Sequence, residues 1–289
     1  GSESLLTEER RTYATPRISP DGSRIAFCVY EGGMPDSVWI YDTEDDFFRR
    51  MTFEGETRDC APVWSPDGEW IAFQSTREGE RRIYRQLADR SGPEELLLSS
   101  PFLQVPTGWS PDGSVFTYFE ARPESSYDIW SISTDSDSEP QILVATPDYD
   151  CCSAFSPDGR WMAYVSGDMS RTQIFVRPFP GSGVTQLVSG EEGGGEPIWS
   201  ADGTELFYRA EGKTMVVSIE TEPGFRAGRP RVLFEGPYVS SSITPGFPYY
   251  DVTPDGQRFL IIQSEEETAQ INVVLNWFEE LKRLAPTDN

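Results

Sequence analysis

A four-residue turn motif recurs along the whole chain and constrains its architecture. Ser65-Pro66-Asp67-Gly68 is the clearest copy, and the same letters occur at 19–22, 110–113 and 156–159, with near copies at 200–203 and 253–256. The copies begin 46, 45, 46, 44 and 53 residues apart. A period in the mid-forties is typical of a protein built from repeated structural units.

Each copy has the chemistry of a tight turn between two strands. Proline presets φ at the first corner, aspartate accepts a backbone N–H, and glycine takes the left-handed conformation that closes the turn. Apolar segments flank the motif, for example at 61–64 and 70–73. We therefore interpret the six repeated aspartates as structural residues, not catalytic ones.

The segments between turns have the composition of short β-strands. In each unit the first strand precedes the turn. A second strand, directly after the turn, is expected at 24–30, 70–75, 115–120, 161–166, 205–209 and 258–263. A third strand, rich in aromatic and β-branched residues, is expected at 37–41, 82–85, 128–132, 173–177, 215–219 and 271–277. A short fourth strand is expected at 50–52, 95–98, 141–144, 186–188 and 231–234. Four strands repeated six times predict an all-β fold, a six-bladed β-propeller of four-stranded blades.

The sixth unit lacks a fourth strand of its own, because the chain ends in a helix-like segment at 278–284. Residues 4–7 (Ser-Leu-Leu-Thr) precede the first turn by the spacing that separates other fourth strands from the next turn. We therefore expect an N-terminal strand at 4–7 to pair with 271–277 and close the last blade, leaving no free edge at the seam. The prediction is a single domain over 3–285, with 1–2 as a cloning remnant and 286–289 as a tail.

The composition excludes several classes of function. The chain has 48 Asp and Glu against 24 Lys and Arg, a formal net charge of −24, which argues against nucleic acid and anionic membranes as partners. It contains no histidine, which excludes a Ser-His-Asp or Cys-His site and any histidine-ligated metal. No apolar run is long enough to span a bilayer, so no direct membrane insertion is expected.

The four cysteines show no Cys-x-x-Cys spacing. Cys28 lies in an apolar strand and is expected to be a small core residue. The adjacent pair Cys151 and Cys152 leaves two alternatives open, a redox-active pair or a soft-metal ligand, beside a plain structural role.

The repeats resemble the PD40 repeat of TolB-type, WD40-like propellers, whose core signature is x-W-S-P-D-G-x-x-I-A-F. Residues 64–73 and 155–164 match this signature closely, and 109–118 less so. Three further stretches, 173–181, 196–209 and 271–282, resemble the C-terminal propeller of bacterial serine/threonine-kinase-like proteins. The resemblance implies a propeller module of a larger bacterial protein. The chain itself has no kinase motif, and the compartment is left open, with an extracytoplasmic part of a membrane-anchored protein as one alternative.

Propellers bind ligands at the mouth of the axial channel, and the innermost strands here are the segments before each turn. Counting back six and four residues from each turn, and including neighbouring polar residues, gives a candidate site at the channel mouth. Its members are Tyr13, Arg58, Asp59, Gln104, Tyr149, Asp150, Glu196, Tyr249 and Tyr250. Asp59, Asp150 and Glu196 would be the ligands of a metal, Ca²⁺ if any, because carboxylate oxygens suit that ion.

We expect a monomeric, non-catalytic module without an obligatory cofactor, a sensor or scaffold that binds a protein, peptide or small molecule at this mouth. Two rivals stay open. One is a calcium-dependent propeller hydrolase, lyase or lactonase with carboxylates in the axial channel, and the other is an assembly platform that uses the sides of the blades.

Overall fold

The computed structural model describes residues 2–30, 36–52, 57–77, 79, 81–123, 126–135, 138–181, 183–239, 247–265 and 268–275. All regular elements within these ranges are β-strands, so the expected all-β fold is confirmed. None of the described residues forms a helix that could cross a membrane. The expected helix at 278–284 lies outside the described residues.

The strands follow the repeat, with one innermost strand before each turn and the others after it. Units 1 and 2 hold β2 (Thr12–Ile18), β3 (Arg24–Tyr30), β4 (Ser37–Asp42), β5 (Phe47–Arg50), β6 (Asp59–Trp64), β7 (Trp70–Ser75), β8 (Arg82–Leu87) and β9 (Glu95–Leu98). Units 3 and 4 hold β10 (Leu103–Trp109), β11 (Val115–Arg122), β12 (Ser126–Ser133), β13 (Gln141–Val144), β14 (Tyr149–Phe155), β15 (Trp161–Asp168), β16 (Arg171–Pro178) and β17 (Gln186–Leu187). Units 5 and 6 hold β18 (Gly195–Trp199), β19 (Glu205–Ala210), β20 (Lys213–Glu220), β21 (Arg226–Ala227), β22 (Arg231–Glu235), β23 (Tyr250–Val252), β24 (Phe259–Glu265), β25 (Thr268–Leu275) and the N-terminal β1 (Ser2–Leu5).

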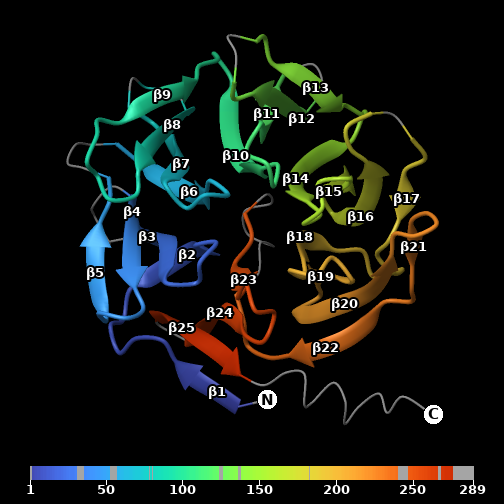
Figure 1. The fold of residues 1–289 in the computed structure, drawn as a ribbon. Helices are drawn as coiled ribbons and strands as arrows, with labels where there is room; N and C mark the ends of the chain where they lie inside the picture. The colour runs from blue at the N-terminus through green and yellow to red at the C-terminus, as the bar shows by residue number, and fades with distance from the viewer. Residues whose placement is uncertain are drawn as a thin grey trace.

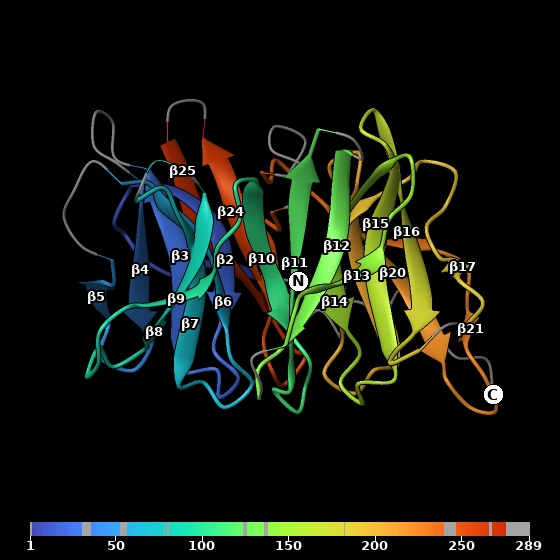
Figure 2. The same ribbon diagram turned by 90° about the horizontal axis from the view of Figure 1, so that it is seen from above.

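The units are arranged as a closed ring around a central axis. Figure 1 shows β2, β6, β10, β14, β18 and β23 nearest the centre, with β5, β9, β13, β22 and β1 at the periphery. Seen at right angles, the strands run between the two faces of the ring (Figure 2). Within a unit, neighbouring strands pair antiparallel, as β6 to β9 do in order.

The sheet count alone does not give the number of blades. The described strands form five sheets, because one parallel pair, Tyr127 with Tyr149, joins units 3 and 4 into a single sheet. The six turns therefore remain the basis of the predicted six blades.

The ring is closed by the N-terminal strand, as expected. β1 pairs antiparallel with β25, from Ser2 opposite Leu275 to Leu5 opposite Asn272. The predicted bounds were offset, since the strand covers residues 2–5 instead of 4–7 and its partner covers 268–275 instead of 271–277. The sheet of unit 6 thus contains strands from both ends of the described chain.

One fourth strand was placed wrongly, because β5 covers 47–50 and not 50–52. Phe48 anchors it, with its ring 4.7 Å from that of Tyr41 and 5.7 Å from that of Phe27. Met51 and Thr52 both direct their backbone N–H to the carbonyl of Val38, at 2.8 and 3.3 Å, so the ladder ends there in a bulge.

The repeated turns have the internal bonds that their sequence predicts. In the first, Gly22 N donates to Ser19 O at 2.8 Å, while Asp21 Oδ1 accepts from Ser19 Oγ at 2.5 Å and from Ser23 N at 3.0 Å. These bonds lower the pKa of Asp21 to about 2, and the bond from Ser19 has the largest effect. Equivalent bonds from a serine or threonine hydroxyl reach Asp67, Asp112, Asp158, Asp202 and Asp255. Each of the six turn aspartates therefore accepts a hydrogen bond within its own turn, as a structural role requires.

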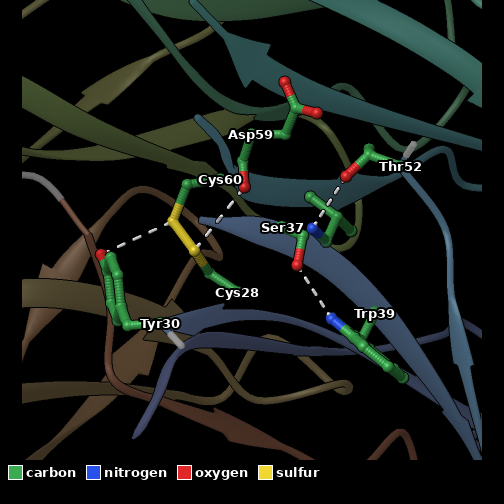
Figure 3. Close-up of a disulfide and its surroundings, with 8 residues drawn as sticks. Cys28, Tyr30, Ser37, Trp39, Thr52, Asp59 and Cys60 are labelled. Carbon is green, nitrogen blue, oxygen red and sulfur yellow. Dashed lines mark hydrogen bonds between the residues drawn. A yellow bond between two sulfur atoms is a disulfide. The ribbon is translucent and has the colours of Figure 1, made fainter. Parts of the chain in front are cut away.

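A disulfide joins units 1 and 2 (Figure 3). Cys28 on β3 is fully buried, as expected, but it is bonded to Cys60 on β6 and is not a lone core residue. Their Cα atoms lie 5.1 Å apart, and the Tyr30 hydroxyl lies 3.6 Å from Cys60 Sγ. Because 32 residues separate the two cysteines in sequence, no local spacing signals this pair. Cys151 and Cys152 are also bonded, to each other.

Candidate functional site: the axial hollow

A hollow of about 350 Å³ lies at the centre of the ring, near the turn ends of the innermost strands. Every unit contributes the residue two positions before its turn. These residues are Arg17, Val63, Gly108, Ala154, Ile198 and Asp251. The wall is thus built by all six repeats, although the residue types differ. A second hollow shares Arg17, Val63, Gly108 and Asp251 and extends over the turns at 19–20 and 65–66.

A bulge in the innermost strands shapes this wall. Pairing with the next strand is interrupted between Ala14 and Arg17, and at the same place in four more units. In four of the strands, the residue four positions before the turn has a positive φ of 49° to 60°: Thr15, Ala61, Cys152 and Glu196. A bulge changes the direction of the side chains that follow it. Here it turns the residue two positions before the turn toward the axis. Proline follows the positive-φ residue in three of these strands, where no ladder bond is needed.

The charged part of the wall lies at the seam between units 6 and 1. Arg17 Nη1 donates to Pro16 O at 2.9 Å and to Tyr250 O at 3.4 Å. Asp251 accepts from Ile18 N at 2.8 Å, across the seam, and from Val252 N at 2.9 Å. Burial lowers the pKa of Arg17, and the charge of Asp251 opposes that shift. Burial likewise raises the pKa of Asp251, which Arg17 opposes.

The rest of the wall is mostly apolar. Trp109, Phe155 and Trp199 present aromatic surface, and Phe247 and Pro248 enter from the segment before β23. A few hydroxyls interrupt this surface, among them Thr107 and Ser153, whose oxygens lie 2.7 Å apart across units 3 and 4. An apolar concavity with a few placed polar groups is the usual form of a ligand site.

The nine residues predicted to form the channel mouth lie elsewhere. None of the nine is among the described residues that line the hollow. Eight of the nine side chains are buried, and only Arg58 is exposed. They lie in the first halves of the innermost strands or just before them, whereas the hollow lies toward the opposite ends. Their role as a ligand site stays a prediction.

Each of the three predicted carboxylates contacts a nearby nitrogen of the protein. Asp59 lies 3.7 Å from Arg77 Nη2, Asp150 accepts from Thr146 N at 2.6 Å, and Glu196 accepts from Tyr249 N at 2.8 Å. Burial raises the pKa of Asp59 and of Asp150. In the described part of the chain, no group of three or more Asp, Glu, Cys or His side chains is arranged to hold a metal ion.

The remaining predicted residues hold strands and units together. Tyr13 donates to Glu9 O at 3.1 Å, and Gln104 Nε2 donates to Glu120 Oε2 at 2.9 Å. Burial raises the pKa of Tyr13 to about 12. Tyr149 packs edge-on against Tyr127, with ring centroids 4.7 Å apart.

Tyr250 and Tyr249 both bind Glu196 and so join units 5 and 6. The Tyr250 hydroxyl donates to Glu196 O at 2.9 Å, beside the bond from Tyr249 N to the Glu196 carboxylate. Burial raises the pKa of Tyr250. Counting back from the turns therefore found the strands that surround the axis. Counting back four residues also reached the wall at Thr15, Ala61, Pro106 and Cys152, but none of these was among the nine residues chosen as the site. The count did not include the positions two residues before each turn.

The ring of antiparallel sheets, its central hollow and its closure by both termini define a β-propeller. A family described as PD40, TolB beta propeller domain, matches residues 1–139. Residues 1–139 thus match the family of TolB-like PD40 β-propellers, as the repeats indicated.

Curated relatives carry two kinds of name. An uncharacterised peptidase of Bacillus subtilis, YuxL, is 27% identical over 203 residues, which cover 68% of this chain and 29% of the relative. The Tol-Pal system protein TolB of Anaeromyxobacter dehalogenans is 33% identical over 110 residues, which cover 38% of this chain and 24% of the relative. The matched region is thus less than a third of either relative.

Solved structures show the same fold at low identity. TolB from Acinetobacter baumannii superposes with a TM-score of 0.60 at 20% identity, covering 78% of this chain and 57% of that one. An oligogalacturonate lyase in complex with manganese superposes with a TM-score of 0.64 at 13% identity, covering 95% of this chain and 93% of that one. At these identities the likeness concerns the fold alone.

Proposed function

We propose that this propeller is a non-catalytic binding module, and that a protein or peptide segment occupies the axial hollow. The observation that carries the proposal is the composition of the wall. Every unit contributes to it the residue two positions before its turn, and the wall is apolar except at Arg17, Asp251 and a few hydroxyls. Such a wall suits a ligand with apolar side chains and a small number of hydrogen-bonding groups. The name of the Tol-Pal relative adds support for a module within a protein assembly.

The absence of histidine from the sequence supports a non-catalytic role, because acyl-transfer triads and histidine-bound metals both need that residue. Peptides selected from a display library against the purified chain provide the test. After incubation with the protein, mass spectrometry should recover a selected peptide intact. Cleavage that persists through repeated purification would contradict the proposal.

We also propose that the propeller is part of a larger bacterial signalling protein, since it matches under a third of the two relatives described above. The two disulfides suit an oxidising compartment, because reducing cytosol keeps such thiols free. Counting thiols in protein isolated from the native host tests the compartment. Four free thiols under trapping conditions would argue against it.

A calcium-dependent enzyme remains the alternative function, and the likeness to a manganese-bound lyase is the observation that favours it. It requires Asp59, Asp150 or Glu196 to bind the ion. Calorimetric titration with CaCl₂ tests this directly, with the Asp59→Asn, Asp150→Asn double variant as comparison. Binding that is lost in the double variant would favour the enzyme over the binding module.

A further inference from the structure

The adjacent cysteines of β14 form a disulfide at the wall of the hollow. Cys151 is fully buried and packs in the core that units 3, 4 and 5 share. Cys152 is 9% exposed and is one of the residues that line the hollow. Both cysteines therefore belong to the core, but Cys152 also lies at the wall, where a small molecule in the hollow can contact the residue.

The repeats show that the fold does not need this bridge. The same strand bulge, with a positive φ at the same position, occurs at Thr15, Ala61 and Glu196 in units that have no adjacent cysteines. A bridge between neighbouring residues also closes almost no loop, so it restricts the unfolded chain very little. Stability gives no reason for Cys151 and Cys152 to be bonded.

We propose that Cys151–Cys152 is a thiol–disulfide exchange site that opens onto the hollow and takes dithiol reductants as its substrate class. A reductant thiolate attacks the sulfur of Cys152, the residue that lines the hollow, and the sulfur–sulfur bond to Cys151 breaks. Cys151 leaves as a thiolate and takes a proton. The second thiol of the reductant then attacks the mixed disulfide, releasing Cys152, which also takes a proton. Two electrons pass to the protein, and the reductant becomes a cyclic disulfide.

The second disulfide serves as an internal comparison. Cys28–Cys60 joins two units, and neither cysteine is among the described residues that line the hollow. Its opening removes a cross-link between units, so it should lower stability. Opening Cys151–Cys152 should leave the fold intact and expose two neighbouring thiols.

The experiment uses the oxidised wild-type chain in native buffer. Samples are treated with dithiothreitol, quenched with acid, alkylated and mapped by mass spectrometry over time. We expect the 151–152 pair to be reduced in the folded protein, with a change in Tm of less than about 1 °C. Phenylarsine oxide, a reagent for paired thiols, should then bind the reduced wild type with one-to-one stoichiometry. It should not bind a Cys151→Ser, Cys152→Ser variant that keeps Cys28 and Cys60 and is treated with dithiothreitol in the same way.

Access through the hollow is tested with Gly108→Phe. A Cβ at Gly108 meets no heavy atom within 4 Å, so the ring has room to enter the hollow. This substitution should slow reduction of the 151–152 pair at least about fivefold and leave the rate for Cys28–Cys60 unchanged. Gly224→Phe, at an exposed glycine with equal free space, is the matched control.

Three results would overturn the proposal. They are a 151–152 pair that stays oxidised until the wild type is denatured, a reduction rate that Gly108→Phe does not change, and a loss of Tm on reduction equal to that caused by opening Cys28–Cys60. The first and third are measured on unaltered protein, so the proposal stays testable even if Gly108→Phe does not fold.

Discussion

Trp64 Nε1 donates a hydrogen bond to the carbonyl of Arg17 at 3.0 Å and thereby ties the innermost strands of units 2 and 1. The same bond recurs between Trp199 and the carbonyl of Ala154, at 3.1 Å, in units 5 and 4. Both acceptors are residues of the hollow's wall, so these two hydrogen bonds help to position the wall. Trp109 occupies the equivalent place in unit 3, yet in the described part of the chain its Nε1 has no hydrogen-bond partner.

Replacing Trp64 with Phe should destabilise the fold more than replacing Trp109 with Phe. The first change removes a hydrogen bond, worth about 1 kcal/mol, and leaves the Arg17 carbonyl without that donor. The second removes a buried N–H that already lacks a partner. Both variants lose comparable aromatic surface, so the difference between their losses of unfolding free energy measures the contribution of the hydrogen bond. Urea unfolding measures it, and equal losses would contradict the role of Trp64 as a tie between units.

Removal of the N-terminal strand should weaken the whole ring. Deleting residues 2–5 removes the four pairs between β1 and β25 and exposes an edge strand. The expected loss is on the order of 2–4 kcal/mol, counted as about one net kcal/mol per lost hydrogen bond. Leu5→Ser provides the comparison, because its side chain is 52% exposed and should contribute little. An unchanged melting curve after the deletion would refute closure by β1.

The repeated turns should make stability depend on acid pH. The pKa of Asp21 falls from 3.8 to about 2 in the fold, chiefly because Ser19 donates to its carboxylate. A depressed pKa stabilises the folded state above about pH 4, and this contribution is lost as the pH falls through about 2. The advantage of wild type over Asp21→Asn should therefore be present at pH 7 and vanish by pH 2.

Denaturant midpoints between pH 2 and pH 7 measure this dependence. Ser19→Ala should reduce the same pH-dependent difference, because it deletes the donor. A wild-type advantage that is constant across this range would show that the carboxylate charge does not matter to the turn.

The disulfide between units 1 and 2 should contribute substantially to stability. For a loop of 32 residues, chain-entropy reasoning gives roughly 3–4 kcal/mol. The Cys28→Ser, Cys60→Ser double variant should lose about that amount, whereas Cys151→Ser, Cys152→Ser should lose far less. Differential scanning calorimetry of both variants compares them. A reversed order would contradict the structural role assigned to Cys28–Cys60.

Much of the fold could be predicted because the turn chemistry is local. Pro, Asp and Gly define each turn within four residues, and the strands at 24–30, 70–75, 95–98 and 141–144 have the predicted bounds. The pairing of β1 could be inferred only from the repeat count, and the bounds of β1 were offset by two residues. Local composition cannot fix the register between the two ends of a chain.

The positions two residues before each turn, which line the hollow in every unit, were missed for a different physical reason. A strand without a bulge alternates its side chains, and counting back by even steps from the turn selects one face. The bulge at Thr15, Ala61, Cys152 and Glu196 breaks that alternation, and its positive φ is uncommon for residues other than glycine. A repeated proline one residue later, at 16, 62 and 197, was the available signal.

The role of the hollow is tested most directly by the dissociation constant of a library-selected peptide, measured by calorimetry for wild type, Gly108→Phe and Gly224→Phe. Gly108→Phe places a ring in the hollow and should raise Kd at least about tenfold, equivalent to about 1.4 kcal/mol. Gly224→Phe should bind as wild type does, and both variants should keep the wild-type circular dichroism spectrum. Wild-type affinity in a folded Gly108→Phe variant would show that the ligand binds elsewhere on the propeller.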